Sequence, residues 1–147
     1  MKVLVDTPIW SRTLRRRERP GNGEQSELTS LVRDGRVAII GPIRQEILSG
    51  IRERAQFDRL RRHLRAFPDT EITVDDYETA AWYSNLCRGK GLQGSNTDFL
   101  ICAIAVRHEF PIFTTDRDFT RLAKVVPIAL YERAYTPSKS SNDRRNE

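Results

Sequence analysis

The sequence has few of the residues that mark secreted, membrane or metal-cage proteins. It contains only two cysteines, two histidines and one methionine in 147 residues. Cys87 and Cys102 lack the spacing of a zinc site or a disulfide framework, which predicts buried free thiols in a reducing compartment. No apolar run approaches the ~20 residues that a membrane span needs, and the N-terminal run ends at Asp6, too early for a secretory signal. These absences predict a cytoplasmic protein.

The sequence also offers little for nucleophilic catalysis by serine or cysteine. His63 and His108 stand singly in helical segments, without a partner at the spacing of a metal site or a catalytic triad. No serine or cysteine therefore has a credible base. Segment 89–94 satisfies the pattern G-x-G-x-x-G, but it follows a predicted helix rather than a strand, so we interpret it as a loop.

Charge is distributed unevenly along the chain, which has a net charge of +5. Segment 12–19 contains five arginines and one glutamate, and segment 51–65 contains six arginines and two acidic residues, so the rest of the chain is acidic. Basic segments on an acidic body suit a polyanionic substrate, and two solvated helix faces are the alternative. The arginines of these segments that we predict to contact such a substrate are Arg15, Arg16, Arg17, Arg61 and Arg62.

Hydrophobic periodicity predicts strands that alternate with helices. The runs that predict strands are 2–5, 37–40, 71–74, 111–115 and 125–130. Between them, apolar residues repeat at helical spacing, and Asp75 and Glu78 have the spacing of a capping box at the start of one helix. The alternation predicts an open parallel α/β sheet with right-handed crossovers. We expect one domain over residues 1–135 and a polar, disordered tail at 136–147.

Four acidic residues stand where such a sheet binds ligands, beyond the carboxyl ends of its strands. Asp6 and Asp116 follow predicted strands, Glu46 lies on a helix after another strand, and Asp98 lies at the start of a buried helix. Each of the last three has a structural alternative, namely helix capping for Asp116, a salt bridge for Glu46 and the helix dipole for Asp98. Four converging carboxylates would repel one another without cations, so together they predict a Mg²⁺ or Mn²⁺ site. Such a site suits phosphodiester hydrolysis.

Four sequence blocks carry these acids. They are KVLVDTPIW at 2–10, PIRQEILSG at 42–50, NTDFLICAIA at 96–105 and TTDRDF at 114–119. In this order, with spacings of 40, 52 and 18 residues between the acids, the blocks resemble those of PIN-domain proteins. The similarity is closest to the VapC-type toxins of VapBC toxin–antitoxin pairs and extends to residue 130.

The resemblance implies a three-layer α/β/α fold with a five-stranded parallel sheet. It also implies an endoribonuclease that depends on Mg²⁺ or Mn²⁺. Within the acidic site, it makes Asp6 and Asp98 the most direct metal ligands and adds Glu46 and Asp116 as further catalytic and metal-binding residues.

The resemblance extends to supporting residues and partners. The hydroxyls of Thr7 and Thr115 would orient carboxylates or solvent, and Asp118 occupies an often acidic position that we leave outside the site. The implied partners are an RNA substrate, a second copy of the chain and a VapB-type antitoxin whose tail blocks the active site. Two alternatives remain, an RNA-processing nuclease without an antitoxin and a non-catalytic RNA-binding PIN domain.

Overall fold

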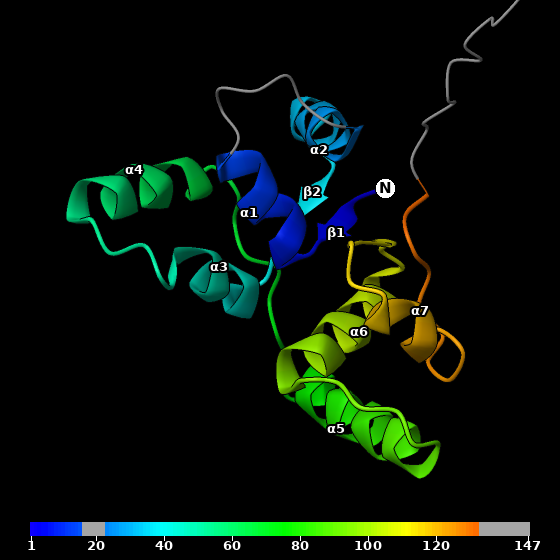
Figure 1. Cartoon of the computed structure of the whole chain (residues 1–147). Coiled ribbons are helices and arrows are strands. Elements are labelled where there is room, and N and C mark those ends of the chain that lie inside the picture. Colours follow the sequence, from blue (N-terminus) through cyan, green and yellow to red (C-terminus); the bar gives the residue numbers. More distant parts are fainter. Residues whose placement is uncertain (16–22, 133–147) are drawn as a thin grey trace, which may run out of the picture.

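The structure, a computed structural model, describes residues 1–15 and 23–132 (Figure 1). The predicted tail at 136–147 and two of the predicted RNA-binding arginines, Arg16 and Arg17, lie outside the described residues. None of the helices described has both the length and the apolar character that a bilayer crossing requires.

A three-stranded parallel sheet forms the centre of the fold. β1 (Val3–Val5) lies between β2 (Val37–Ala38) and β3 (Ile112–Phe113), so the strand order is β2-β1-β3. Leu4 has a backbone partner in both neighbouring strands. Every residue of the three strands is buried, as expected for a parallel sheet that is covered on both faces.

The prediction of a five-stranded sheet is wrong, because two of the predicted strands do not form. The first is 71–74, where the only pairing that the described residues form nearby is a single bridge between Asp69, just before this segment, and Ile39. The chain leaves the sheet because Thr73 caps the next helix, α5 (Val74–Gly89), and its hydroxyl accepts a hydrogen bond from the third residue of that helix.

The predicted strand at 125–130 is also absent. Only Leu130 forms a bridge, to Ile112 of β3. The amides of the first two residues of the segment turn back to the carbonyl of Leu122. Pro127, which follows them, has no N–H for a strand ladder.

Seven helices surround the sheet in the described part of the chain. They are α1 (Thr7–Arg15), α2 (Gly23–Arg33), α3 (Gly41–Leu48), α4 (Arg54–Leu64), α5, α6 (Asn96–His108) and α7 (Asp118–Leu122). Figure 1 shows α1 to α4 gathered on one side of the sheet and α5 to α7 on the other. α5 packs along α6, and α1 packs against α2 and α3. The predicted parallel α/β fold is therefore confirmed.

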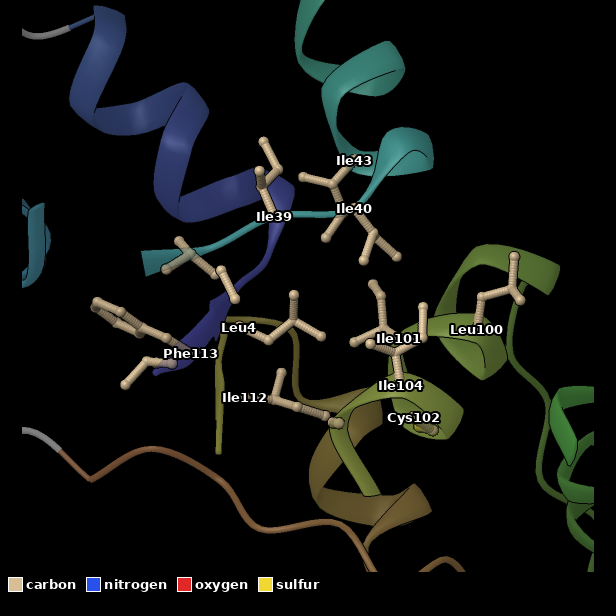
Figure 2. Close-up of a cluster of buried hydrophobic side chains, with 14 of the residues drawn as sticks. Leu4, Ile39, Ile40, Ile43, Leu100, Ile101, Cys102, Ile104, Ile112 and Phe113 are labelled. Carbon is tan, nitrogen blue, oxygen red and sulfur yellow. The ribbon is translucent and has the colours of Figure 1, made fainter. Parts of the chain in front are cut away.

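Helix α6 runs through the hydrophobic core. Every residue from Phe99 to Ala105 is buried. Figure 2 shows Ile101 and Ile104 facing apolar side chains of the sheet, such as Leu4 and Ile112. Because α6 is enclosed in this way, its first turn is held in place relative to the end of β1.

Both cysteines are buried free thiols, as predicted. Burial raises the pKa of Cys87 and raises the pKa of Cys102 to about 12. The two thiols therefore stay protonated and unreactive at neutral pH.

Candidate active site

Asp6 lies at the carboxyl end of the central strand. The chain passes from β1 through Asp6 directly into α1, and the Asp6 N–H donates to the carbonyl of Phe113 at 2.9 Å. Asp6 is only 6% exposed. Its Oδ1 accepts the N–H of Thr7 at 2.8 Å, and its Oδ2 accepts the hydroxyl of Thr114 at 2.8 Å. Both carboxylate oxygens are therefore oriented by the fold.

Glu46 reaches the same edge of the sheet from α3. Its Oε2 accepts the hydroxyl of Thr7 at 3.2 Å. Thr7 thus connects two carboxylates, with its amide bound to Asp6 and its hydroxyl to Glu46. Glu46 is exposed and forms no salt bridge with any residue that the structure describes, so the salt-bridge alternative finds no support there.

Asp98 lies in the first turn of α6, where it forms a capping box with Ser95. The Ser95 N–H donates to Asp98 Oδ2 at 3.0 Å, and the Asp98 N–H donates to Ser95 Oγ at 3.1 Å. The structural role expected for a carboxylate at this helix terminus is therefore present. It occupies one oxygen only, because Oδ1 accepts no hydrogen bond from the residues described.

Asp116 is connected to the site through Thr114. The Asp116 N–H donates at 3.0 Å to the Thr114 hydroxyl, which itself donates to Asp6. Oδ1 of Asp116 accepts the N–H of Asp118, the first residue of α7, at 2.9 Å. This bond lies in the turn before α7, whose N-cap is Arg117 without a side-chain cap, so the helix-capping alternative for Asp116 finds no support.

Thr114 is a site residue that the sequence analysis missed. The sequence predicts a supporting hydroxyl at Thr115, whose side chain makes no hydrogen bond with another described residue. Thr114 is the first residue after β3, and Asp6 is the first residue after β1. Because Val5 and Phe113 are paired in the sheet, the two side chains that follow them lie next to each other.

The carboxyl group of Asp6 is unusually basic. Burial is the largest cause, and the negative charges of Asp98 and Glu46 add to it, whereas the hydrogen bonds from Thr114 and Thr7 oppose it. The result is a pKa of about 6, raised from the ordinary 3.8. Asp98 and Glu46 are thus electrostatic neighbours of Asp6, and the three charges face one another without a compensating cation among the described side chains.

The four predicted acids do not form a closed metal cage. Among residues 1–15 and 23–132, no group of three histidine, cysteine, aspartate or glutamate side chains is arranged to hold a metal ion. The donor chemistry nevertheless fits Mg²⁺ or Mn²⁺, because these hard ions keep several waters and take only one or two carboxylates from the protein. The buried carboxylate of Asp6, with its raised pKa, is the charge that such an ion would neutralise.

Of the five predicted RNA-binding arginines, the structure describes the side chains of Arg61 and Arg62. The structure does not describe Arg16, Arg17 or the side chain of Arg15. Arg61 lies 3.4 Å from Asp58, and Arg62 is exposed without a carboxylate partner among the described residues. Both are on α4, which Figure 1 shows on the opposite side of the molecule from α6. If they bind RNA, they do so away from the acidic site.

Comparison with protein-family models matches residues 3–125 to the family described as PIN domain. The chain belongs to the PIN domain family. The predicted resemblance is thereby confirmed, and this PIN domain also has relatives that are named VapC ribonucleases.

Two of these relatives are Ribonuclease VapC11 of Mycobacterium tuberculosis and VapC ribonuclease Mb1587 of Mycobacterium bovis. Each is 29% identical over 127 residues, which cover 84% of this chain and 92% of the relative. Solved structures share the fold of this PIN domain at 18% identity. FitAcB from Neisseria gonorrhoeae has a TM-score of 0.71, covering 88% of this chain and 96% of its own. VapBC2 from Rickettsia felis, bound to a promoter DNA fragment, has a TM-score of 0.72, covering 89% and 98%.

Proposed function

We propose that this PIN domain is a metal-dependent endoribonuclease and the toxin of a type II toxin–antitoxin pair. The observation that carries the proposal is the buried Asp6 at the end of the central strand, facing the charges of Asp98 and Glu46. Relatives named as ribonucleases support RNA as the substrate. Structural neighbours that are toxin–antitoxin complexes, one of them from Klebsiella pneumoniae, support an antitoxin partner.

In the proposed reaction, Asp6 and Asp98 would hold a Mg²⁺ or Mn²⁺ ion. Such an ion would supply a lowered pKa for a water molecule and positive charge opposite the phosphodiester. Glu46 is held through Oε2 by Thr7, so its Oε1 is available to take a proton from the attacking water. The water oxygen then bonds to phosphorus while the bond to the leaving ribose oxygen breaks, and solvent protonates that oxygen.

Metal-dependent cleavage of RNA is the direct test. The purified protein should cut a labelled total-tRNA probe in Mg²⁺ or Mn²⁺, stop in EDTA and recover when Mn²⁺ is added back. The variant Asp98→Asn should cut about 10³-fold more slowly, because it removes the charge of a metal ligand but keeps a capping side chain. Rates from denaturing gels measure both effects. Metal-dependent RNA binding without any cleavage would instead identify a non-catalytic RNA-binding PIN domain.

An apolar groove suits an apolar segment of the antitoxin. It has a volume of about 320 Å³ and lies between α1, α2 and the end of α4. Trp10, Leu14 and Leu28 line it together with Leu64 and Phe67. The Trp10 and Phe67 rings meet edge to face with centroids 5.2 Å apart, so the groove has a preformed apolar floor. We place an apolar segment of the antitoxin there.

Helix α5 suits contact with a second copy of the chain. Most of the large apolar side chains that the described residues expose lie on α5, namely Val74, Tyr77, Trp82 and Leu86. Trp82 is 61% exposed, although tryptophan seldom remains so unless it contacts a partner. We therefore assign the proposed homodimer contact to the side of α5 that carries Trp82 and Leu86, which are four residues apart on the helix.

Light scattering on the co-purified complex tests both partners. Co-expression with the product of the neighbouring small reading frame should give a complex that contains two copies of this chain. When this chain is purified without the antitoxin, Trp82→Glu should halve its measured mass, because the dimer separates. Leu14→Glu should release the antitoxin but leave the mass of the toxin dimer unchanged. Growth arrest that the neighbouring gene product relieves would favour a toxin, whereas cleavage without growth arrest would favour an RNA-processing nuclease.

A further inference from the structure

The loop from Gly91 to Gly94, between α5 and α6, is anchored at both ends. Gly91 has a φ of 73°, and its N–H donates to the carbonyl of Arg88 at 3.0 Å. At Gly94 an added Cβ would lie 3.2 Å from the ring of Phe99 and 3.6 Å from Cβ of Asp98. The chain is therefore held close to one of the catalytic carboxylates.

Two polar cavities flank this loop. The first, of about 300 Å³, lies between the loop and α7 and is lined by Asp118 and Arg121. The second, of about 260 Å³, lies between the loop and the end of α5 and is lined by Arg88. Leu92 and Gln93 line both cavities. Each cavity thus combines one guanidinium group with the same loop residues.

The Gln93 side chain has no role in holding the fold. It is exposed, and its amide makes no hydrogen bond with another residue of the described chain. Leu92, in contrast, is half-buried and packs against the core. The loop is therefore fixed by one side chain while its neighbour presents a free donor and a free acceptor to the cavities.

Both cavities lie close to acids of the candidate active site. The second is lined by Gly94, where an added Cβ would lie 3.6 Å from Cβ of Asp98. The first is lined by Asp118, whose N–H donates to Asp116 at 2.9 Å. A strand of RNA with its scissile phosphate at the carboxylates would pass over this loop.

The two arginines are available to bind phosphate. Arg88 is exposed and has no carboxylate partner among the described residues. Arg121 lies 3.1 Å from Asp118, but these side chains are 65% and 48% exposed, so the pair contributes little and can be exchanged for a phosphate. Arginine binds phosphate oxygens with two parallel hydrogen bonds, which suits both positions.

We propose that Gln93 reads an adenine next to the cut phosphodiester, while Arg88 and Arg121 hold the phosphates on either side of it. The glutamine amide donates one hydrogen bond and accepts another, which matches N7 and the N6 amino group of adenine. Single-stranded RNA exposes this base edge to protein side chains. The inference rests on the proposed nuclease function and adds its base preference and the residues that set it.

Four fluorescent single-stranded RNAs that differ in one base provide the test. Binding is measured by anisotropy with the non-cutting variant Asp6→Asn, and cleavage is measured with the otherwise unchanged protein. Gln93→Ala should remove an adenine preference of about tenfold or more. Gln93→Glu should move the preference to cytosine, because a carboxylate accepts from the cytosine amino group. Arg88→Ala and Arg121→Ala should weaken binding to all four RNAs and each reduce the salt dependence by about one phosphate contact.

Ser30→Ala, at an exposed position on α2 outside both basic segments, is the control and should change neither the base preference nor the salt dependence. Identical base preferences in the Gln93 variants and the parent would overturn the inference and leave the nuclease function intact. A preference that depends on Gln93 in binding, with no cleavage by any protein that keeps Asp6, would overturn the nuclease function and leave Gln93 only as a residue that sets the base preference of RNA binding.

Discussion

Replacing Asp6 with asparagine is expected to abolish RNA cleavage and, in the absence of metal, to stabilise the fold at neutral pH. Activity should fall by about 10³-fold or more, because the substitution removes the central carboxylate of the metal site. Stability should rise because the same carboxylate is buried against two other negative charges. Asp6 is therefore expected to be required for catalysis although its negative charge destabilises the folded state.

The pH dependence follows from the raised pKa of Asp6. Its pKa is about 6 in the folded chain against an ordinary 3.8, so the folded state holds an extra proton between these two pH values. The contribution of this group to stability is therefore complete below pH 3.8 and is lost as the pH rises through about 6. The loss amounts to about 3 kcal/mol, at ~1.4 kcal/mol for each tenfold change in the acid constant.

Urea unfolding in EDTA measures this effect. At pH 7.5 the free energy of unfolding of Asp6→Asn should exceed that of the parent by up to about 3 kcal/mol, and the difference should vanish near pH 3.5. Asp34→Asn, at an exposed position, is the control and should stay within about 0.5 kcal/mol at every pH. A less stable Asp6→Asn protein at pH 7.5 would contradict the burial and charge assigned to Asp6.

Replacing Arg107 with alanine is expected to destabilise the protein by about 3 kcal/mol. Arg107, near the end of α6, binds both oxygens of Asp76 near the start of α5, at 2.7 and 2.8 Å, and also the carbonyl of Glu71 at 3.0 Å. Asp76 is 2% exposed, so loss of the arginine leaves a buried carboxylate without its cation. The pair matters for function because it fastens together the two helices that position Asp98.

The stability that the Arg107–Asp76 pair contributes changes with pH in the opposite direction to the contribution of Asp6. Burial raises the pKa of Asp76, but the hydrogen bonds from Arg107 and Thr73 outweigh it and lower the pKa below 3.8. The stability from this pair is therefore present above pH 3.8 and is lost as the pH falls through the lower, folded-state pKa. The difference in the free energy of unfolding between the parent and Arg107→Ala should therefore become smaller as the pH falls below 3.8.

The role of the Arg107–Asp76 pair is checked by measuring the free energy of unfolding of the two single variants and the double variant. Arg107→Ala combined with Asp76→Ala should recover part of the lost stability, because the buried charge is then removed as well. Arg54→Ala breaks an exposed pair with Asp58 and should cost less than about 1 kcal/mol. Equal losses for Arg107 and Arg54 would mean that the buried pair does not stabilise the fold.

The strands that the sequence predicted correctly are those in which the chain is buried on both faces. The predicted segments 2–5, 37–40 and 111–115 contain β1, β2 and β3, because continuous apolar β-branched runs leave few alternatives. The segments 71–74 and 125–130 have similar composition but lie at the edges, where a capping threonine and a proline end the pairing. Composition alone does not distinguish an edge strand from a segment that leaves the sheet.

The capping box of α5 shows that local sequence also does not decide which single residues form a contact. The sequence predicted a box from Asp75 to Glu78, whereas the structure forms it between Thr73 and Asp76. Both pairs have the required spacing of three residues. The choice between them is made by Arg107, which binds Asp76 from thirty-one residues away and places that carboxylate inside the fold.

The scarcity of cysteine and histidine left carboxylates as the chemistry available to this chain. The sequence by itself determined the order of these carboxylates and the strands and helices that carry or precede them. Local patterns carry that information, because burial and helix starts depend on near neighbours. Only the tertiary structure decided that Thr114, rather than Thr115, binds Asp6 across 108 residues. It also decided that Asp98 keeps one oxygen free and that Gln93 lies between two cavities. These contacts depend on the packing of distant segments to within about an ångström, which no local pattern specifies.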